Sequence, residues 1–276
     1  MSKKVSVGWR CPTNEAGEGF GFNESGMEHF AGDPFSAIAR EITQNTNDAK
    51  KSNPAYLVFR LVNVPIDQFP NRDEFVNILG KCRTASEGES QKAVTFFDNA
   101  LKKIEGGNIS FLVARDRNTT GIQGPCKRGT PYHAFMKSTG TSRKDNADSG
   151  GSFGIGKNAP FAISDFRTVF VLTNYMGTDG NIEQLAQGKS ILVSHGNDGT
   201  EFTNNAYWGS KDDFGPLNAD GPSIPGWMKD PFADGIDEVQ LGTSIFIAGF
   251  RSNSKWDKII TAYIIQNFFA AIEQKD

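Results

Sequence analysis

Cysteine and histidine are scarce in this chain of 276 residues. The cysteines are odd in number and far apart, and none has the paired spacing of a metal site: Cys11, Cys82 and Cys126. Such a set predicts neither a disulfide framework nor a zinc centre, and a reducing cytoplasm is its simplest setting. The histidines are equally isolated, so we expect each to be structural or exposed: His29, His133 and His195.

Long apolar runs are also lacking. No stretch of the sequence approaches the about 18 apolar residues that a membrane span requires. The segment from Met1 to Arg10 contains lysines, but no apolar segment follows them as a secretion signal would need. We therefore expect a cytoplasmic protein that is neither exported nor embedded in a membrane.

The chain has no excess of positive charge. Its formal net charge is −3 and its pI is near 5.7. Domains whose whole surface binds nucleic acid are usually basic, so the charge does not indicate direct nucleic-acid binding. Any such contact would be local or would come through a partner. The length and the hydrophobic content of 37% fit one large soluble domain or two small ones.

Glycine is abundant, with 30 residues, and many of them gather in two places. The first cluster lies between Glu15 and Gly26, and the second lies between Gly140 and Gly156. Glycine clusters indicate loops with unusual backbone geometry. We interpret residues 1–33 as an N-terminal arm or strap. No periodicity is visible from Lys127 to Ser152, which predicts a long functional loop.

A helix is predicted from Pro34 to Lys51, because Asp33 provides an N-cap and proline suits the first helical position. Three polar residues at helical spacing border its apolar face instead of opposing it: Glu41, Asn45 and Asp48. We expect them to be partly buried, which costs free energy unless partners compensate. The stripe is either a site for a polar or charged ligand, or a helix edge with satisfied polar groups.

Strands and helices follow in an irregular order that favours an α+β protein over a regular βαβ array. Alternating apolar residues predict strands, and apolar residues at a spacing of three to four predict helices. The predicted strands are 5–8, 56–64, 109–114, 167–174, 181–194, 200–202 and 241–248. The predicted helices after the first are 73–82, 90–104, 158–164 and 256–273, and residues 208–238 are expected to be mostly irregular.

The run from Gly151 to Lys157, Gly-Ser-Phe-Gly-Ile-Gly-Lys, is suited to phosphate binding. Glycines let backbone amides approach an anion closely, and the N-terminal end of a following helix adds positive potential. The spacing differs from that of a Walker A loop, and no strand directly precedes it as a dinucleotide fingerprint requires. A purely structural turn is the alternative reading of this cluster.

Four motifs occur together in a recognisable order, and they span about residues 30–250. The set is Glu41-x-x-x-Asn45-x-x-Asp48-Ala49, then Asp116 with Gly121 and Gly124, then Gly151 to Lys157, then Gly242-Thr243. This set resembles the N-box, adenine box, lid hinge and Gly-Thr strand of the GHKL ATPase superfamily. That superfamily includes gyrase, the large heat-shock chaperones, sensor histidine kinases and mismatch-repair ATPases.

The resemblance implies the Bergerat fold, a two-layer α/β sandwich of α+β class with a mixed β-sheet. Residues 34–250 would form the ATP-binding domain, with a helical insertion at 73–105 and an ATP lid at 127–156. Residues 251–276 would form a C-terminal helix that either packs on this domain or leads into a further domain. Such relatives close the lid over ATP and then dimerise or engage a partner.

The resemblance also implies roles for the helix 34–51. Glu41 would be the general base that orients water against the γ-phosphate, a task that suits a partly desolvated carboxylate. Asn45 would ligate Mg²⁺ through its side-chain oxygen, with the triphosphate and water supplying the other ligands. Asp48 would contribute to the nucleotide pocket, either by touching nucleotide or by structuring the pocket.

Other implied contacts lie further along the chain. Asp116 would accept the adenine amino group, and Thr243 would support the same edge through water. The remaining nucleotide contacts would come from Gly121 of the adenine box and from Gly151, Phe153, Gly154 and Gly156 of the hinge. The sequence departs from the family twice: the loop after Asp116 is longer, so that Asn118 and Thr120 gain contacts, and Lys157 follows the last glycine. Lys157 would either add charge near the γ-phosphate or face solvent.

The implied activity is slow Mg²⁺-dependent hydrolysis of ATP, used as a conformational or dimerisation switch in a larger machine. Relatives serve in DNA topology change, repair, chaperoning and phage defence, so a DNA-acting or antiviral role is among the expectations. The partners implied are ATP, a second copy of the chain, and a protein partner or additional C-terminal domain. Two alternatives stay open: a nucleotide-sensing scaffold without significant turnover, and a phosphotransferase of the histidine-kinase type.

Overall fold

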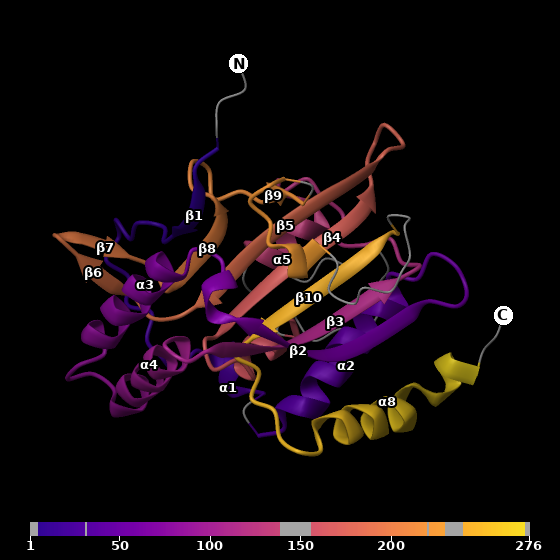
Figure 1. Ribbon diagram of the computed structural model, residues 1–276, viewed down its shortest axis with the longest axis horizontal. Helices are drawn as coiled ribbons and strands as arrows, with labels where there is room; N and C mark the ends of the chain where they lie inside the picture. The colour runs from indigo at the N-terminus through magenta and orange to yellow at the C-terminus, as the bar shows by residue number, and fades with distance from the viewer. Residues whose placement is uncertain (1–4, 31, 139–155, 220, 230–239, 274–276) are drawn as a thin grey trace.

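An eight-stranded antiparallel β-sheet forms the centre of the protein (Figure 1). The computed structural model describes residues 5–30, 32–138, 156–219, 221–229 and 240–273. The strands follow the order β1-β8-β5-β4-β10-β3-β2, and β9 pairs with β5. Their bounds are β1 Val7–Arg10, β2 Tyr56–Pro65, β3 Asn108–Arg117, β4 Thr168–Met176, β5 Ile182–Ile191, β8 Asn205–Ser210, β9 Leu217–Asn218 and β10 Gly242–Ala248. A separate hairpin pairs β6 His195–Asn197 with β7 Thr200–Phe202.

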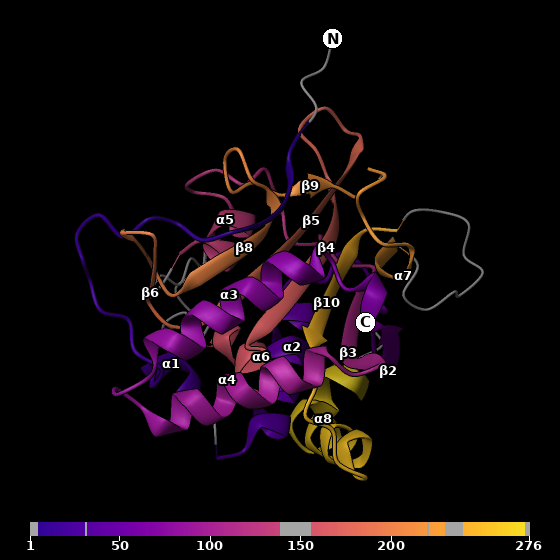
Figure 2. The ribbon, with the colours of Figure 1, turned by 60° about the vertical axis from the view of Figure 1, so that its left-hand side comes forward.

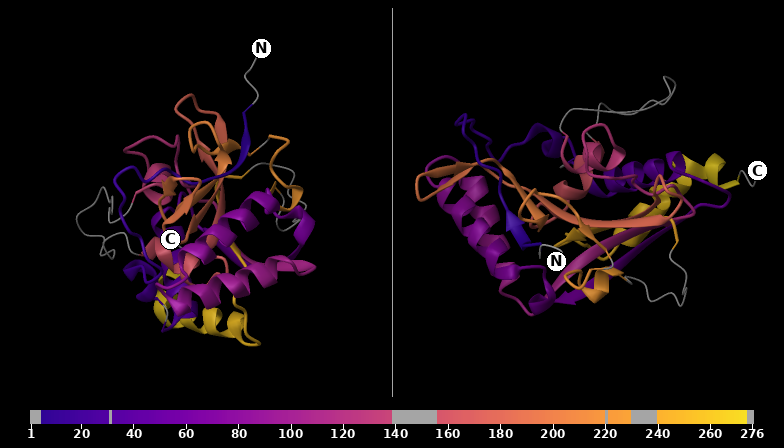
Figure 3. Two further views of the ribbon diagram at one scale, coloured as in Figure 1. Left: turned by 90° about the vertical axis from the view of Figure 1, so that its left-hand side faces the viewer. Right: turned by 90° about the horizontal axis from the view of Figure 1, so that it is seen from above.

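The helices lie on both sides of this sheet (Figure 3). The longer ones are α2 Pro34–Asp48, α3 Arg72–Ala85, α4 Gln91–Ile104 and α8 Trp256–Glu273. The shorter ones are α1 Ser25–Glu28, α5 Pro131–Met136, α6 Ala159–Ala162 and α7 Gly226–Lys229, with 3-10 turns η1 Ile66–Gln68 and η2 Gly156–Asn158. The α+β class predicted from the sequence is therefore confirmed.

Alternation along β3 shows how the two faces are covered. Phe111 and Val113 point into a core that contains residues of α3 and α4. Leu112 and Ala114 point the other way, into a core that contains residues of α2 and α6. Figure 2 shows α3 and α4 in front of the sheet and α2 behind it. The central strands are apolar on both faces, so both faces need a cover.

Two details of the predicted sandwich are wrong. The two-layer arrangement fails because α3 and α4, expected as an insertion at 73–105, pack on the sheet face opposite α2. The mixed sheet fails because every strand pair in the described residues is antiparallel. The strands β3 and β4 do run in the same direction, but β10 lies between them and runs opposite to both.

Most predicted elements are found within a few residues of their expected bounds. The helix α2 begins as predicted, because Asp33 accepts a hydrogen bond from the Ser36 amide at 3.2 Å. The segment 127–152 is not a loop throughout, since α5 forms there with Thr130 as its N-cap. The segment 208–238 also contains β9 and α7, short elements whose few residues give no periodicity.

Candidate functional site

The sheet face toward α2 changes from apolar to polar near one end of three adjacent strands. Along β3, β10 and β4 that face carries apolar side chains packed with α2, including Ala114, Ile245 and Val171. Two positions nearer that end of each strand, the same face carries Asp116, Thr243 and Thr173. Thr243 and Thr173 are direct register partners, and Ser244 pairs with Arg115. The topology therefore gathers one carboxylate and two hydroxyls.

Asp116 is held in a fixed orientation at this polar end. Its Oδ1 atom accepts a hydrogen bond from the Thr119 hydroxyl at 2.6 Å and another from the Thr243 amide at 2.9 Å. Burial raises the pKa of the Asp116 carboxyl, and these two hydrogen bonds only partly oppose that effect. Gly242 lets the backbone of β10 lie close to that of Asp116, because a Cβ atom at position 242 would lie 2.2 Å from the Asp116 carbonyl oxygen.

The loop after β3 is held against the two threonines. The Ile122 amide donates to Thr173 Oγ1 at 2.9 Å and to Thr243 Oγ1 at 3.1 Å. Gly121 has a φ of +66°, and a Cβ atom there would lie 2.3 Å from the Asn174 carbonyl oxygen. Glycine is needed at this position for conformation and for space. The structure thus brings Asp116, Gly121 and Thr243 together, as the motif order predicted.

The side chain of Asn118 forms hydrogen bonds with the connection between α2 and β2. Its side chain accepts a hydrogen bond from Ser52 Oγ at 2.8 Å and donates one to the Pro54 carbonyl at 2.8 Å. The Thr120 amide donates to the Ala49 carbonyl at 2.8 Å. These bonds tie the loop after β3 to the connection between α2 and β2. The described contacts therefore give Asn118 a positioning role for the loop.

Glu41 lies on α2 beside the end of the glycine-rich run. Its side chain is 13% exposed, and its Oε1 atom forms an ion pair with Arg40 Nη2 at 3.0 Å. A Cβ atom at Gly156 would lie 1.7 Å from Glu41 Oε2, so the carboxylate contacts the glycine backbone directly. The structure thus joins the predicted base to the one hinge glycine that it describes. Three predicted hinge residues lie outside the described part of the chain: Gly151, Phe153 and Gly154.

Asn45 and Asp48 are exposed, and the prediction that they are partly buried is wrong. The buried positions near the end of α2 are Ile42 and Thr46, so the covered face is rotated toward Thr46 and away from Asn45. The Thr46 hydroxyl donates to the Ile42 carbonyl at 3.0 Å and needs no other partner. Asn45 is one helical turn beyond Glu41 on the same side of α2, where its amide oxygen is open to a ligand.

Lys157 does not simply face solvent, because its side chain is held by backbone carbonyls. Its ammonium group donates to the Ala134 carbonyl at 2.8 Å and also to the Ser138 carbonyl, at the C-terminal end of α5. Cations are favoured there by the partial negative charge of a helix end. Burial lowers the pKa of Lys157. This lysine therefore links η2 to α5 within the predicted lid segment.

Two further lysines, Lys137 and Lys189, gather near the same segment, and Lys189 was not predicted from the sequence. Lys189 of β5 is 5% exposed, and burial lowers its pKa to about 7, with Lys157 and Lys137 nearby acting in the same direction. The Lys137 ammonium lies 3.3 Å from the centroid of the Tyr207 ring, and its pKa is lowered to about 8 by burial. The strand β5 mixes polar and apolar residues, so its sequence carried no signal for Lys189.

Thr173 was also missed, although β4 carried a signal for it. Along the α2 face of this strand a threonine follows Val169 and Val171, where alternation alone would place another apolar residue. Thr119 had no such signal, because it lies in a loop whose path depends on its contacts. Both side chains touch groups that the motifs had identified, Thr243 and Asp116.

The described residues contain no group of three or more His, Cys, Asp or Glu side chains that could hold a metal ion. Asn45 offers a single amide oxygen on α2. Mg²⁺ prefers six oxygen ligands and often takes most of them from phosphates and water. The residues present therefore fit Mg²⁺ that arrives with a nucleotide, and they do not fit a metal site made by protein alone.

No protein-family model matches the chain, and no curated protein matches it. Among the helices of the described residues, none combines the length and the apolar character needed to cross a membrane.

Proposed function

We propose that this chain is a GHKL-type ATP-binding domain that hydrolyses ATP slowly with Mg²⁺. The observation that carries the proposal is the pair of Asp116 and Thr243. A partly buried carboxylate is fixed by a strand amide, next to buried hydroxyls, at the end of an otherwise apolar sheet face. Adenine carries an exocyclic amino group that donates to such a carboxylate, whereas guanine presents a carbonyl oxygen at the equivalent position.

The phosphates would extend from that end of the sheet toward α2. Gly156 would offer its backbone there, and Glu41, in direct contact with it, would orient water for hydrolysis. Asn45 would hold Mg²⁺, which neutralises developing phosphate charge when bound. The lysines at positions 137, 157 and 189 supply positive charge close to the predicted lid, which supports an anionic ligand.

The nucleotide would act as a switch through the segment 127–156. Lys157 already connects η2 to α5 in that segment, so a change at Gly156 is transmitted to α5 through one side chain. Closure over ATP would complete a surface for a second copy or another partner. The helix α8 supports a partner or further domain, because Ile265 is 53% and Phe269 60% exposed on it.

A second function, nucleotide sensing without significant turnover, is favoured by one contact. Arg40 pairs with the Oε1 atom of Glu41 at 3.0 Å. The pair occupies one of the two carboxylate oxygens, and the other lies against Gly156, so less of the carboxylate is available to orient water. A scaffold of this kind would bind ATP and change shape without hydrolysing it at a significant rate.

Calorimetric titration with ATP and with GTP, each with Mg²⁺ and with a chelator, tests the proposal. We expect ATP to bind at least about tenfold more tightly than GTP, since the carboxylate faces a donor in one base and an acceptor in the other. We also expect Mg²⁺ to strengthen ATP binding. Equal affinities for the two nucleotides would remove the adenine assignment. Phosphate release, measured in the same samples, separates the ATPase from the scaffold.

A further inference from the structure

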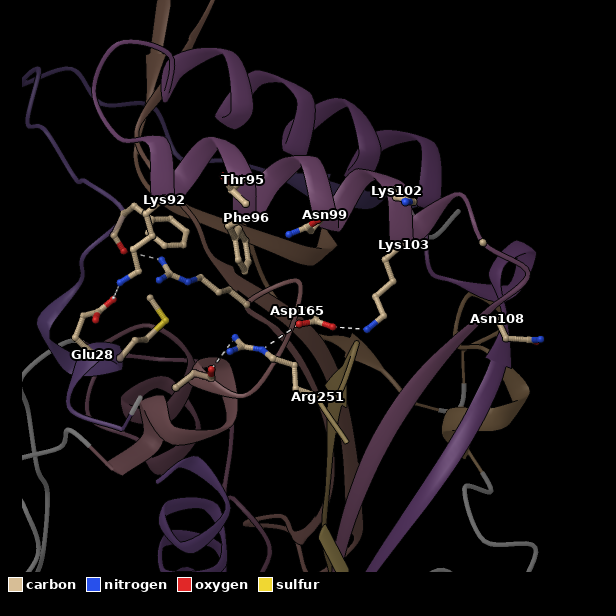
Figure 4. Close-up of a pocket in the computed structure, with 15 residues that line it drawn as sticks. Glu28, Lys92, Thr95, Phe96, Asn99, Lys102, Lys103, Asn108, Asp165 and Arg251 are labelled. Atoms are coloured by element: carbon tan, nitrogen blue, oxygen red, sulfur yellow. Dashed lines mark hydrogen bonds and ion pairs between the residues drawn. The ribbon is translucent and has the colours of Figure 1, made fainter. Parts of the chain in front are cut away.

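A second cavity lies at the opposite end of the central strands. It is bounded by α4, by the loop between α6 and β4, and by the residues that follow β10 (Figure 4). Its volume is about 800 Å³, within the range of ligand sites. Asn108 at the start of β3 lines this cavity, whereas Asp116 lies near the end of the same strand. The cavity is therefore distinct from the proposed ATP site.

The lining of this cavity is cationic although the chain as a whole is acidic. Two carboxylates, Glu28 and Asp165, face five basic side chains: Lys92, Lys102, Lys103, Arg167 and Arg251. The local excess is three positive charges in a protein of net charge −3. Cavities lined by one sign of charge concentrate ligands of the opposite sign.

Basic groups stand at both ends of the cavity, as Figure 4 shows. At one end Lys92 pairs with Glu28 at 2.8 Å. At the other end Asp165 is shared by Lys103 and by Arg251, whose Nε lies 3.0 Å from Asp165 Oδ1. The α4 lysines span eleven residues, or about 16 Å of helix. That length exceeds one phosphate group and matches a ligand with several separated anionic groups.

Arg167 is the most constrained of these cations. It is 5% exposed, and its guanidinium lies 3.6 Å from the centroid of the Phe22 ring. Its Nη1 donates to the Phe22 carbonyl at 2.8 Å, and within the described residues it has no carboxylate partner. Its φ of +47° is unfavourable for a residue with a side chain. Glu28 and Glu24 support its charge from a longer distance, but no ion pair to it is formed within the described residues. A buried guanidinium without a direct ion pair, in a strained backbone, indicates a place where an anion can bind.

The middle of the cavity offers an aromatic ring and an amide. Phe96 of α4 is partly exposed and points into the space beside Asn99 (Figure 4). Its ring also packs against Phe22 at 5.0 Å between centroids, which fixes its plane. Cationic grooves with exposed aromatic rings bind the phosphates and the base faces of single-stranded nucleic acid.

We propose that this cavity binds nucleotide phosphates, with cations at its ends against phosphate groups and Phe96 against a base. Two sources share this chemistry, a free nucleotide and a single strand of nucleic acid. The proposal confines the contact to this one face, which agrees with the low overall charge. It does not depend on ATP binding at the other end of the strands.

Fluorescence polarisation with a labelled oligothymidylate of about ten nucleotides tests the proposal at low salt, on the order of 50 mM. Thymine has no exocyclic amino group to donate to Asp116, so the proposed ATP site does not compete for it. The variant is Lys102→Glu, at an exposed residue without a described ion pair. The matched control is Lys258→Glu, an equal charge reversal on an exposed part of α8.

Wild-type protein and Lys258→Glu should bind the oligothymidylate with equal affinity, and Lys102→Glu should bind it at least about fivefold more weakly. The slope of log affinity against log salt should fall by about one for Lys102→Glu. Displacement by thymidine diphosphate identifies the free nucleotide as the source, and binding of the strand alone identifies nucleic acid. No binding at low salt, or equal losses in both variants, would overturn the proposal.

Discussion

The carboxylate of Glu41 lies directly against the α-carbon of Gly156. A Cβ atom at position 156 would lie 1.7 Å from Glu41 Oε2 and 2.3 Å from its Cδ. No larger residue fits there unless the carboxylate moves. Under the proposed function, this contact places the candidate base beside the hinge of the lid.

Gly156→Ala should therefore reduce ATP hydrolysis more than ATP binding. The added methyl group displaces Glu41, and small misplacements of reacting groups cost about 10- to 100-fold in rate. Phosphate release and calorimetry measure the two effects separately. Gly80→Ala is a matched control, because no atom lies within 4 Å of a Cβ atom there. Wild-type turnover in Gly156→Ala would show that the contact has no catalytic role.

Glu41→Gln tests the base directly, since it keeps the shape of the side chain and removes its charge. We expect ATP to bind normally and phosphate release to fall by roughly 100-fold or more, the usual contribution of a general base. Gln44→Ala, about one turn along α2 from Glu41 and also partly buried, serves as the control. Unchanged hydrolysis in Glu41→Gln would leave nucleotide sensing as the better function.

Local sequence signals predicted most elements, because the formation of a helix or strand depends largely on residues that are close in the chain. The N-cap at Asp33 and the alternation of β2 depend on neighbours in the chain, and both appear as expected. The strand order depends on which surfaces meet after folding. The insertion of β10 between β3 and β4 has no local signature, and the prediction of a mixed sheet failed at that point.

The residues of the candidate site also fall into those that local motifs predicted and those whose positions depend on the tertiary structure. Asp116, Gly121 and Thr243 belong to motifs, and the structure brings them together. Lys157 is different, because its position depends on the C-terminal end of α5, a helix that the sequence did not reveal. The exposure of Asn45 depends on the exact rotation of α2 against its neighbours, which a helical wheel fixes only to within one residue.

Asp116→Asn should abolish ATP binding and yet stabilise the protein near neutral pH. Burial raises the carboxyl pKa, so the folded state holds its proton at a higher pH than the unfolded state. Stability is therefore lost as pH rises from the ordinary value of 3.8 through the raised pKa. The amide removes that loss and keeps an acceptor for Thr119 and Thr243. Thermal melts from acid to neutral pH and calorimetry measure both effects.

The contrasting variant is Asp116→Ala, which removes the acceptor as well as the charge. The Thr243 amide and the Thr119 hydroxyl then lose their bonds of 2.9 and 2.6 Å, at a cost of about 1 to 3 kcal/mol for each group left unpaired. We expect this variant to melt below wild type. Wild-type ATP affinity in Asp116→Asn would contradict the adenine assignment.

Lys189→Met should stabilise the protein, by an amount that depends on pH. Burial, together with repulsion from Lys157 and Lys137, lowers the pKa of Lys189 from 10.5 to about 7. The unfolded chain therefore binds the extra proton between these values, and wild-type stability rises with pH across that window. The apolar variant lacks this rise. Its advantage should be greatest at pH 7 and below, roughly 1 to 4 kcal/mol, and should shrink toward pH 10.

Urea unfolding at several pH values between about 6 and 10 measures this difference. Lys258→Met, at an exposed position on α8, should shift stability little and equally at every pH. A pH-independent change in Lys189→Met would show that the ammonium of Lys189 is solvated in the folded protein. If the stabilised variant also binds ATP more weakly, the buried charge is retained for the triphosphate, since a cation that costs stability without a ligand is offset when an anion binds.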